Sequence, residues 1–320
     1  MNALLLYYGT PYNESEIRSY YSDILQGREP SEALLADLRE RYRIIGKSPL
    51  NEITFSLAHR LEGRLNQRIN CFTAGLTSAP GARAACPGAR VYVGAKHGSP
   101  RIPEVVRQMI GDGVRRAVVV VIAPHYSLRS TAEYRERVEG ALLDYGKIDV
   151  LYTPEYYDHP EYISLLAARL NRAFWRVRKP ENAAVYFSAH SIPESAVSID
   201  GGIYPRQVEA TARATAQRLG LERWRVVWQS AGRSGGNWIG PDINDALRED
   251  SQRGIREVVV AAIGFPADHL EVLYDIDIEA RHTAQQNGIS LVRVESLNDA
   301  DDYVNLLANL VEATWYGDAV

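Results

Sequence analysis

Cysteine is scarce in this chain of 320 residues, which contains only Cys71 and Cys86. Two thiols cannot supply a four-cysteine iron–sulfur cluster or a closed zinc site. A disulfide between them is possible on spacing but is not expected in a reducing compartment. We therefore expect no iron–sulfur cluster and two free cysteines in a loop or on the surface.

Long apolar runs and an excess of positive charge are also missing. No stretch of about 18 or more apolar residues occurs, so we expect no membrane insertion. The formal net charge of -4 at pH 7 argues against nucleic acid as the main partner. The N-terminus has neither a positive n-region nor a cleavage site, which predicts a cytoplasmic protein. Neither G-x-G-x-x-G nor a P-loop pattern is present, so a nucleotide is not favoured.

Apolar strand-like segments alternate with helical segments along the chain. Strands are predicted at residues 3–8, 91–95, 116–122, 149–152, 184–188, 225–229, 257–263 and 290–293. Helices are predicted at 13–24, 32–42, 54–66, 162–177, 205–219 and 302–314, and from residues 102, 130, 242 and 264 onward. Such alternation is typical of α/β folds, in which helices cover a parallel sheet on both faces. The Gly-, Ala- and Pro-rich segment from Asn70 to Arg90 is predicted to be a loop insertion.

The strand pattern divides the chain into two similar α/β halves, 1–155 and 156–320. The last helix is expected to pack back on the first half. In parallel sheets, ligands bind beyond the carboxyl ends of the strands. Turns at four such ends, two from each half, start at Tyr8, Ala123, Ser188 and Gly264. We therefore expect the active site in the cleft between the halves.

An acidic segment follows the seventh predicted strand. Glu271, Asp275 and Glu279 are four residues apart, so an α-helix would stack all three carboxylates on one face. Like charges at this spacing cost roughly 0.2–0.5 kcal/mol per pair, and no basic residue of the segment offsets them before Arg281. We interpret this acidic lane as a path for a cation. Asp268, three residues before Glu271, fits the lane and a helix-capping box equally well.

His190 directly follows an apolar strand, inside the sequence Ser-Ala-His-Ser. A lone histidine at such a place is more often structural than functional. Glu271 follows the corresponding strand later in the same half, and imidazole with carboxylate suits ferrous iron and similar metals. No H-E-x-x-H spacing is present, so a tightly held zinc ion is not indicated. Two ligands would form an open, weak site, as an enzyme that hands its metal on requires.

Several motifs resemble those of ferrochelatases. They are Tyr7-Tyr8-Gly9-Thr10-Pro11-Tyr12, Ser48-Pro49-Leu50, Ala123-Pro124-His125-Tyr126-Ser127, Ser188-Ala189-His190-Ser191-Ile192-Pro193, Trp228-Gln229-Ser230, Trp238-Ile239-Gly240-Pro241 and the run from Asp268 to Asp275. The resemblance covers essentially the whole chain and is closest to the water-soluble bacterial coproporphyrin ferrochelatases. It implies two Rossmann-like, chelatase-type domains with a porphyrin in the cleft between them.

The resemblance assigns roles to the histidine and the acidic residues. His190 and Glu271 match the catalytic pair that binds iron, in which the imidazole accepts a pyrrole proton and the carboxylate stabilises the cation. Asp275 and Glu279 match an outer cation relay behind Glu271, where a hydrated Mg²⁺ can sit. Tyr8 matches a residue on the opposite porphyrin face, an axial oxygen ligand to the product iron.

The resemblance also assigns porphyrin-binding roles to Arg41, Tyr42 and Ser48, which match residues that hold propionates, and to Tyr126, which matches a further pocket contact. An arginine is a fitting fork for a carboxylate, although Arg41 could instead form a helix-surface ion pair with Asp37. Arg28 is a weaker candidate, because Leu25-Gln26 replaces the basic pair that precedes this position in the family. This departure from the family pattern makes the expected binding of one porphyrin propionate weaker.

Together these features predict a lyase that inserts ferrous iron into coproporphyrin III to form Fe-coproporphyrin in haem biosynthesis. Iron is then a substrate, no cofactor is tightly bound, and downstream haem-synthesis enzymes are further candidate partners. Protoporphyrin IX is the alternative porphyrin. A non-catalytic haem or metal carrier would not need the proton acceptor His190. A chelatase for cobalt or nickel would usually carry a second histidine in place of Glu271.

Overall fold

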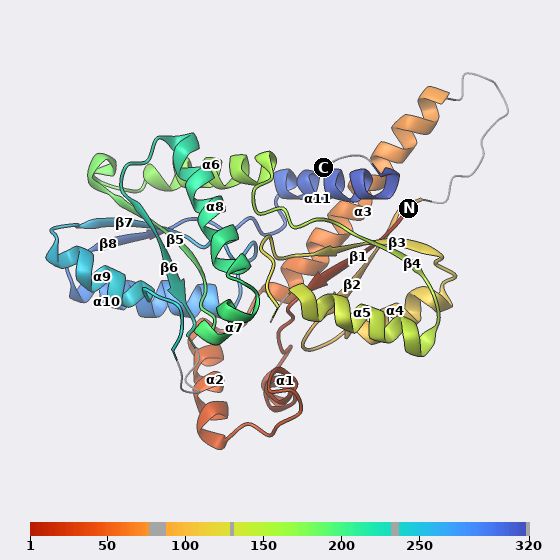
Figure 1. Ribbon diagram of the computed structural model, residues 1–320, viewed down its shortest axis with the longest axis horizontal. Helices are drawn as coiled ribbons and strands as arrows, with labels where there is room; N and C mark the ends of the chain where they lie inside the picture. The colour runs from red at the N-terminus through yellow and green to blue at the C-terminus, as the bar shows by residue number, and fades with distance from the viewer. Residues whose placement is uncertain (77–87, 129–130, 232–236, 318–320) are drawn as a thin grey trace.

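The structure is a computed structural model that describes residues 1–76, 88–128, 131–231 and 237–317. Within these residues the chain forms two four-stranded parallel sheets flanked by helices, which confirms the predicted α/β class (Figure 1). The strand orders are β2-β1-β3-β4 and β6-β5-β7-β8. The second sheet therefore repeats the topology of the first.

The strands follow the predicted apolar runs to within two residues at each end. The first sheet contains β1 (Asn2–Tyr7), β2 (Arg90–Ala95), β3 (Arg116–Val121) and β4 (Asp149–Tyr152). The second contains β5 (Ala184–His190), β6 (Trp224–Gln229), β7 (Glu257–Ala261) and β8 (Ser290–Arg293). The inner strands are buried over nearly their whole length, because helices cover both faces of each sheet.

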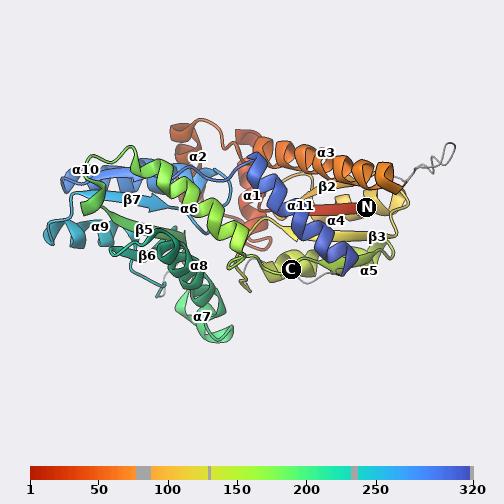
Figure 2. The same ribbon diagram turned by 90° about the horizontal axis from the view of Figure 1, so that it is seen from above.

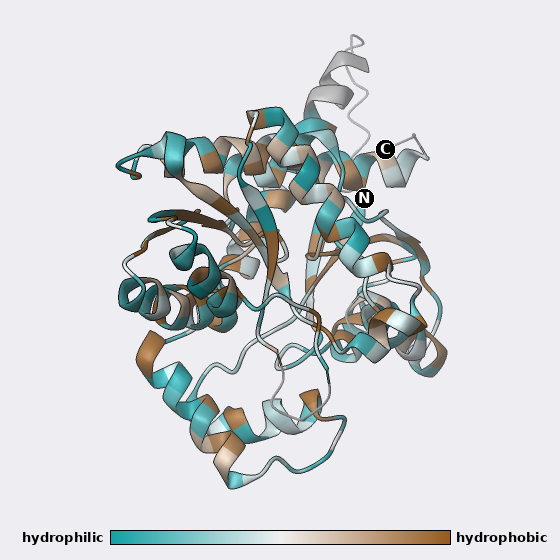
Figure 3. Ribbon diagram, turned by 60° about the vertical axis from the view of Figure 1, so that its left-hand side comes forward, coloured by the Kyte–Doolittle hydropathy of each residue, from teal (hydrophilic) through white to brown (hydrophobic). Residues whose placement is uncertain are grey.

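Helices lie on both faces of the sheets in the view from above (Figure 2). Those that precede β5 are α1 (Ile17–Ile24), α2 (Glu32–Ile45), α3 (Leu50–Leu76), α4 (Ile102–Gly111), α5 (Thr131–Tyr145) and α6 (Pro160–Phe174). Those that follow β5 are α7 (Glu194–Ile199), α8 (Ile203–Leu219), α9 (Ile243–Gln252), α10 (Arg281–Gln286) and α11 (Asp301–Tyr316). Short 3-10 turns are η1 (Glu14–Glu16) and η2 (Pro180–Asn182). Apolar residues concentrate on the strands, whereas the helices carry most of the polar residues (Figure 3). None of the helices in the described ranges is long and apolar enough to cross a bilayer.

Helix α3 is longer than predicted and ends at Leu76 instead of near residue 66. Leu57, Leu61 and Leu65 recur every fourth residue and are buried in the core, and Ile69 packs against the same core. This apolar stripe explains why the helix continues beyond residue 66 toward the Gly-, Ala- and Pro-rich segment.

The predicted loop from Asn70 to Arg90 is therefore wrong for its first part. Residues 70–76 are helical, and Cys71 belongs to α3 and not to a loop. Residues 77–87 of the predicted insertion, with Cys86, lie outside the described residues, and its last residue, Arg90, already begins β2.

The acidic segment after β7 forms the π-helix η3 (Val272–Ala280) in place of the predicted α-helix. A π-helix closes its backbone hydrogen bonds over five residues instead of four, and runs longer than one turn are rare. Helix η3 packs against α2 of the first half. This contact brings α2 to the acidic lane.

The last helix, α11, packs along α3 of the first half (Figure 1). Three arginines of α3 meet residues of α11 at a constant separation of 241 positions: Arg60 with Asp301, Arg64 with Asn305, and Arg68 with Asn309. A constant separation requires that the two helices run parallel. We call this set of contacts the arginine ladder.

Candidate functional site

A cavity of about 490 Å³ lies between the two sheets and is lined by residues of both halves. This volume falls in the range that holds small-molecule ligands. All four predicted strand-end turns contribute to its wall, through Tyr8, Ala123, His190 and Gly264 among others. These turns follow β1, β3, β5 and β7, where the strand order of each sheet changes direction. Ligands of doubly wound sheets bind at such switch points.

His190 and Glu271 face each other in this cavity. The Nε2 atom of His190 lies 3.6 Å from Glu271 Oε1. The Nδ1 atom of His190 is in hydrogen-bond contact with the carbonyl oxygen of Ser191. A second imidazole contacts the same carboxylate, because His269 Nε2 lies 3.7 Å from Glu271 Oε2. Glu271 is thus held between two histidines, of which the sequence analysis assigned a role to only one.

The charges of this pair depend on each other. Burial disfavours the imidazolium of His190, but the Glu271 carboxylate outweighs burial and raises the pKa of His190 to about 9. Burial also opposes ionisation of Glu271, yet His190 and His269 outweigh it and lower the pKa of Glu271. At neutral pH the pair is therefore an imidazolium and a carboxylate. A divalent cation that binds here must first displace the proton from His190.

Two glycines allow the backbone approaches that shape this wall. A Cβ atom on Gly264 would lie 2.9 Å from the Cβ of Ala189, so only glycine lets the turn after β7 reach the end of β5 beside His190. Gly9 has φ +87°, and a Cβ there would lie 1.7 Å from the carbonyl oxygen of His97. Both turns therefore require glycine on steric grounds.

The acidic lane contains an arginine from the first half. Arg41 Nη1 lies 3.1 Å from Asp275 Oδ1, and Arg41 Nη2 lies 3.8 Å from Glu279 Oε1. Ser230 donates a further hydrogen bond to Asp275. Burial, and then the Glu271 charge, raise the pKa of Asp275 to about 7 despite these partners. The positive charge that the acidic segment itself does not supply thus comes from Arg41 of α2.

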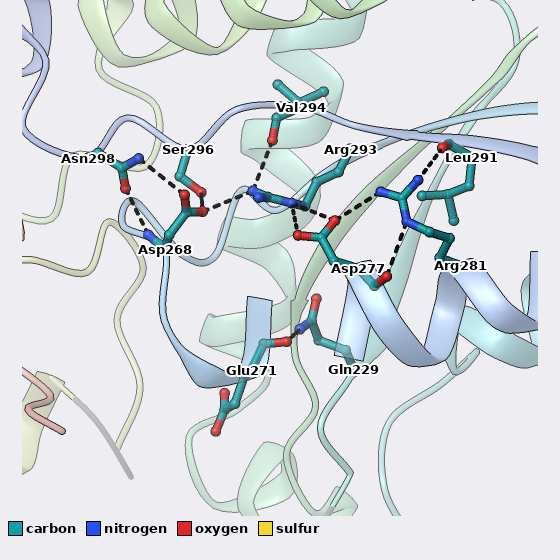
Figure 4. Close-up of polar contacts among 10 residues, drawn as sticks. All are labelled: Gln229, Asp268, Glu271, Asp277, Arg281, Leu291, Arg293, Val294, Ser296 and Asn298. Carbon is teal, nitrogen blue, oxygen red and sulfur yellow. Dashed lines mark hydrogen bonds and ion pairs between the residues drawn. The ribbon is translucent and has the colours of Figure 1, made fainter. Parts of the chain in front are cut away.

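Asp268 turns away from the lane toward β8 (Figure 4). Its carboxylate accepts hydrogen bonds from Arg293 at 2.9 Å and from Ser296 at 2.7 Å. Its backbone N–H donates to Asn298 Oδ1 at 2.8 Å. Asp268 thus faces this cluster and not the neighbours of the lane, so its place in the lane is not supported.

Tyr8 lies on the first-half side of the cavity. Its ring packs edge-on against His97, with the ring centroids 4.8 Å apart. Burial, and then the Glu271 charge, raise the pKa of Tyr8 well above its ordinary value, so the phenol stays protonated at neutral pH. Tyr8 and the His190–Glu271 pair therefore approach the same space from different halves.

Four other predicted binding residues are absent from the described lining of the cavity: Arg41, Tyr42, Ser48 and Tyr126. The hydroxyl of Tyr42 lies 2.8 Å from Thr10 Oγ1. Ser48 Oγ is buried without a hydrogen-bond partner among the described residues. The backbone N–H of Tyr126 donates to Gln207 Oε1 at 2.6 Å. Their roles in porphyrin binding stay predictions.

A charged group on the first-half wall was missed by the sequence analysis. Lys96 and His97 line the cavity and directly follow β2, at the same sheet edge as Tyr8. Lys96 Nζ lies 2.6 Å from Glu133 Oε2, and His97 Nδ1 contacts Asp23. Burial outweighs the Asp23 contact and lowers the pKa of His97 to about 4. Because both residues directly follow a predicted strand, their position in the sequence could have indicated a place at the cavity.

Comparison with known proteins gives consistent matches along the chain. The family model described as ferrochelatase matches residues 2–315. The chain is 52% identical over 316 residues to a ferrochelatase of Thermus thermophilus, across 98% of this chain and 99% of that protein. It is 38% identical over 316 residues to a coproporphyrin III ferrochelatase of Geobacillus kaustophilus, across 98% and 95%. The solved structure of SirB from Bacillus subtilis with Fe³⁺ is similar at a TM-score of 0.58 and 12% identity, across 98% and 94%. This last likeness concerns the fold alone.

Proposed function

The chain belongs to the ferrochelatase family, and from this premise we propose that it inserts ferrous iron into coproporphyrin III and releases Fe-coproporphyrin. Metal insertion into a porphyrin is the family's activity. The observation that carries the proposal is the imidazole–carboxylate pair of His190 and Glu271 in a cavity between the halves. Relatives named for coproporphyrin III support this substrate, whereas the Thermus relative's name specifies no porphyrin. The cytoplasmic location expected from the sequence is part of the proposal.

The chemistry exchanges two pyrrole protons for one cation. Fe²⁺ that reaches Glu271 displaces the proton of the pair to water. His190 Nε2 can then accept one proton from a pyrrole nitrogen, and the second pyrrole proton passes to water. The Glu271 carboxylate, held between His190 and His269, stabilises the cation electrostatically. From the other half, Tyr8 offers a phenol oxygen as the axial ligand to the product iron.

The acidic lane is the proposed route for iron. The Glu279 side chain is 40% exposed, that of Asp275 5% and that of Glu271 29%, so the lane runs from the surface through a buried carboxylate to the cavity. The single guanidinium of Arg41 is shared by both carboxylates in this structure, and its Nε also lies 3.1 Å from Asp37 Oδ2, the helix-surface ion pair expected as the alternative. If Arg41 takes a porphyrin propionate as its partner, Asp275 and Glu279 become available to a cation.

The outer Mg²⁺ predicted at Asp275 and Glu279 fits this lane only in part. Across the described residues, no three His, Cys, Asp or Glu side chains gather into a metal-binding group. Mg²⁺ keeps several waters and binds through one or two carboxylates, which the exposed Glu279 could supply. A hydrated ion at Glu279 is therefore the form that we include in the proposal.

Initial rates with coproporphyrin III and with protoporphyrin IX, measured with Fe²⁺ in the absence of oxygen, test the substrate. We expect turnover of coproporphyrin III, and turnover of protoporphyrin IX alone would overturn the substrate assignment. The His190→Ala variant should lose about 100-fold or more in kcat, because it removes the proton acceptor. Insertion at the parent rate by this variant would favour a carrier or another mechanism.

A further inference from the structure

A cluster of polar side chains connects the turn before the π-helix with the end of β8, apart from the side chain of Glu271 (Figure 4). We call it the Arg293 cluster, and it consists of Arg293, Asp268, Asp277, Ser296 and Asn298. Arg293 is the last residue of β8, and its side chain is only 15% exposed. The guanidinium lies between two carboxylates that come from different parts of the acidic segment.

The contacts of Arg293 join the turn before η3 to the middle of the helix. Its Nη1 atom lies 2.9 Å from Asp268 Oδ1, in the turn that follows β7. Its Nε atom lies 2.9 Å from Asp277 Oδ2, on η3 itself. Ser296 reinforces the first contact, and Arg281 reinforces the second at 3.2 Å. Glu271 lies between the two points that Arg293 connects.

A π-helix of this length is rare, and side chains from outside it contact its start and its middle. Helix η3 spans nine residues, whereas π-helical segments in proteins are mostly single turns within α-helices. Gln229 supplies one support, since its Nε2 donates to the backbone carbonyl of Glu271 at 3.1 Å. Arg293 supplies the other, since it fixes the entry turn relative to the helix. Both act on the segment that carries the Glu271 side chain into the cavity.

We propose that Arg293 is a positioning residue for metal insertion, which holds Asp268 and Asp277 together so that Glu271 faces His190. Arg293 is not among the described residues that line the cavity, so it acts through Glu271. The inference rests on the proposed function, because it assigns Glu271 to the iron. An ordinary ion pair that only stabilises the second half would leave metal binding unchanged.

The Arg293→Met variant tests this role, with Arg169→Met as the matched control. Arg169 is also buried, at 4% exposed, and pairs with Asp302 at 2.7 Å, which joins α6 to α11 away from the cavity. We expect Arg293→Met to lower kcat and to raise KM for Fe²⁺, each about tenfold, with KM for the porphyrin unchanged. Arg293→Lys should recover part of the loss, because an ammonium can still reach one carboxylate. Arg169→Met should lose stability while its kinetic constants stay at parent values.

Binding of Co²⁺ alone, without porphyrin, provides a readout that does not depend on turnover. Affinity should fall about tenfold in Arg293→Met and stay unchanged in Arg169→Met. Parent values of Co²⁺ affinity and of KM for Fe²⁺ in Arg293→Met would overturn the inference. So would an equal rise of KM for iron and porphyrin, which indicates general loosening. If the parent protein inserts no iron, the proposed function fails, and the Co²⁺ titration still decides the role of Arg293.

Discussion

The two halves meet at the arginine ladder and at the cavity, and the two contacts use charge in opposite ways. In the ladder, each arginine of α3 has an acidic or amide partner on α11, and Arg68 also reaches Glu312. In the cavity and lane, carboxylates lie near one another and share Arg41 and His190. The ladder pairs each arginine with a partner within the protein, whereas in the cavity and lane several carboxylates share few cationic partners.

The pKa values of two aspartates express the same difference. In the ladder region, a hydrogen bond from Ser56 lowers the pKa of Asp299. In the lane, burial and Glu271 raise the pKa of Asp275 to about 7. Asp299 thus favours its charged form where the halves are joined, and Asp275 disfavours its charged form in the lane, whereas Glu271 between its two histidines favours the carboxylate. This contrast predicts that mutations on the two sides separate stability from activity.

On the cavity side, Glu271→Gln should have the largest effect of the changes considered, and the effect should be on activity. The substitution keeps the shape of the side chain but removes the charge that pairs with His190 and that we propose to bind the cation. We expect kcat for iron insertion to fall about 100-fold or more, with little change in thermal stability. Anaerobic initial rates and the unfolding temperature measure the two effects. Glu312→Gln in the ladder is the matched control, and an equal loss of activity there would remove the contrast.

His125, which lines the cavity, should make the stability of the cavity side depend on pH. This buried histidine of the first half lies 2.9 Å from Thr211 of α8, and burial lowers its pKa to about 3. The unfolded chain binds a proton below about pH 6.5 that the folded protein excludes. The contribution of neutral His125 to the free energy of unfolding is therefore complete above about pH 6.5. It decreases on acidification, by about 2 kcal/mol at pH 5. Denaturant unfolding of the parent and of His125→Gln measures this, and equal pH dependence in both would contradict it.

On the ladder side, Arg68→Ala should have the smallest effect of the changes considered, and the effect should be on stability. Its guanidinium contacts Asn309 at 2.9 Å and Glu312, and its side chain is partly exposed. We expect a loss of about 1 kcal/mol in the free energy of unfolding, with kcat and KM unchanged. Urea denaturation and a steady-state assay measure both quantities. A lower kcat at unchanged stability would mean that the ladder also controls the cavity.

The sequence was sufficient to predict features that depend on neighbours along the chain. Apolar runs located the strands, and His190 and Glu271 stood out because each comes soon after a strand of the second half. The π-helix was missed because carboxylates spaced by four fit an α-helix as well. The Arg41–Asp275 contact was missed because 234 positions separate the two residues and only the folded chain brings them together.

The repeated strand order has a consequence for the geometry of the reaction. The first strand of the first half, β1, corresponds to β5 of the second, since each lies second in its sheet. Tyr8 directly follows β1, and His190 ends β5, so the two occupy equivalent places in two copies of one topological unit. A planar ring between the copies would meet the same position from above and below, once as a phenol and once as an imidazole. The repeat therefore presents one topological position twice to the cavity, with a different functional group from each half.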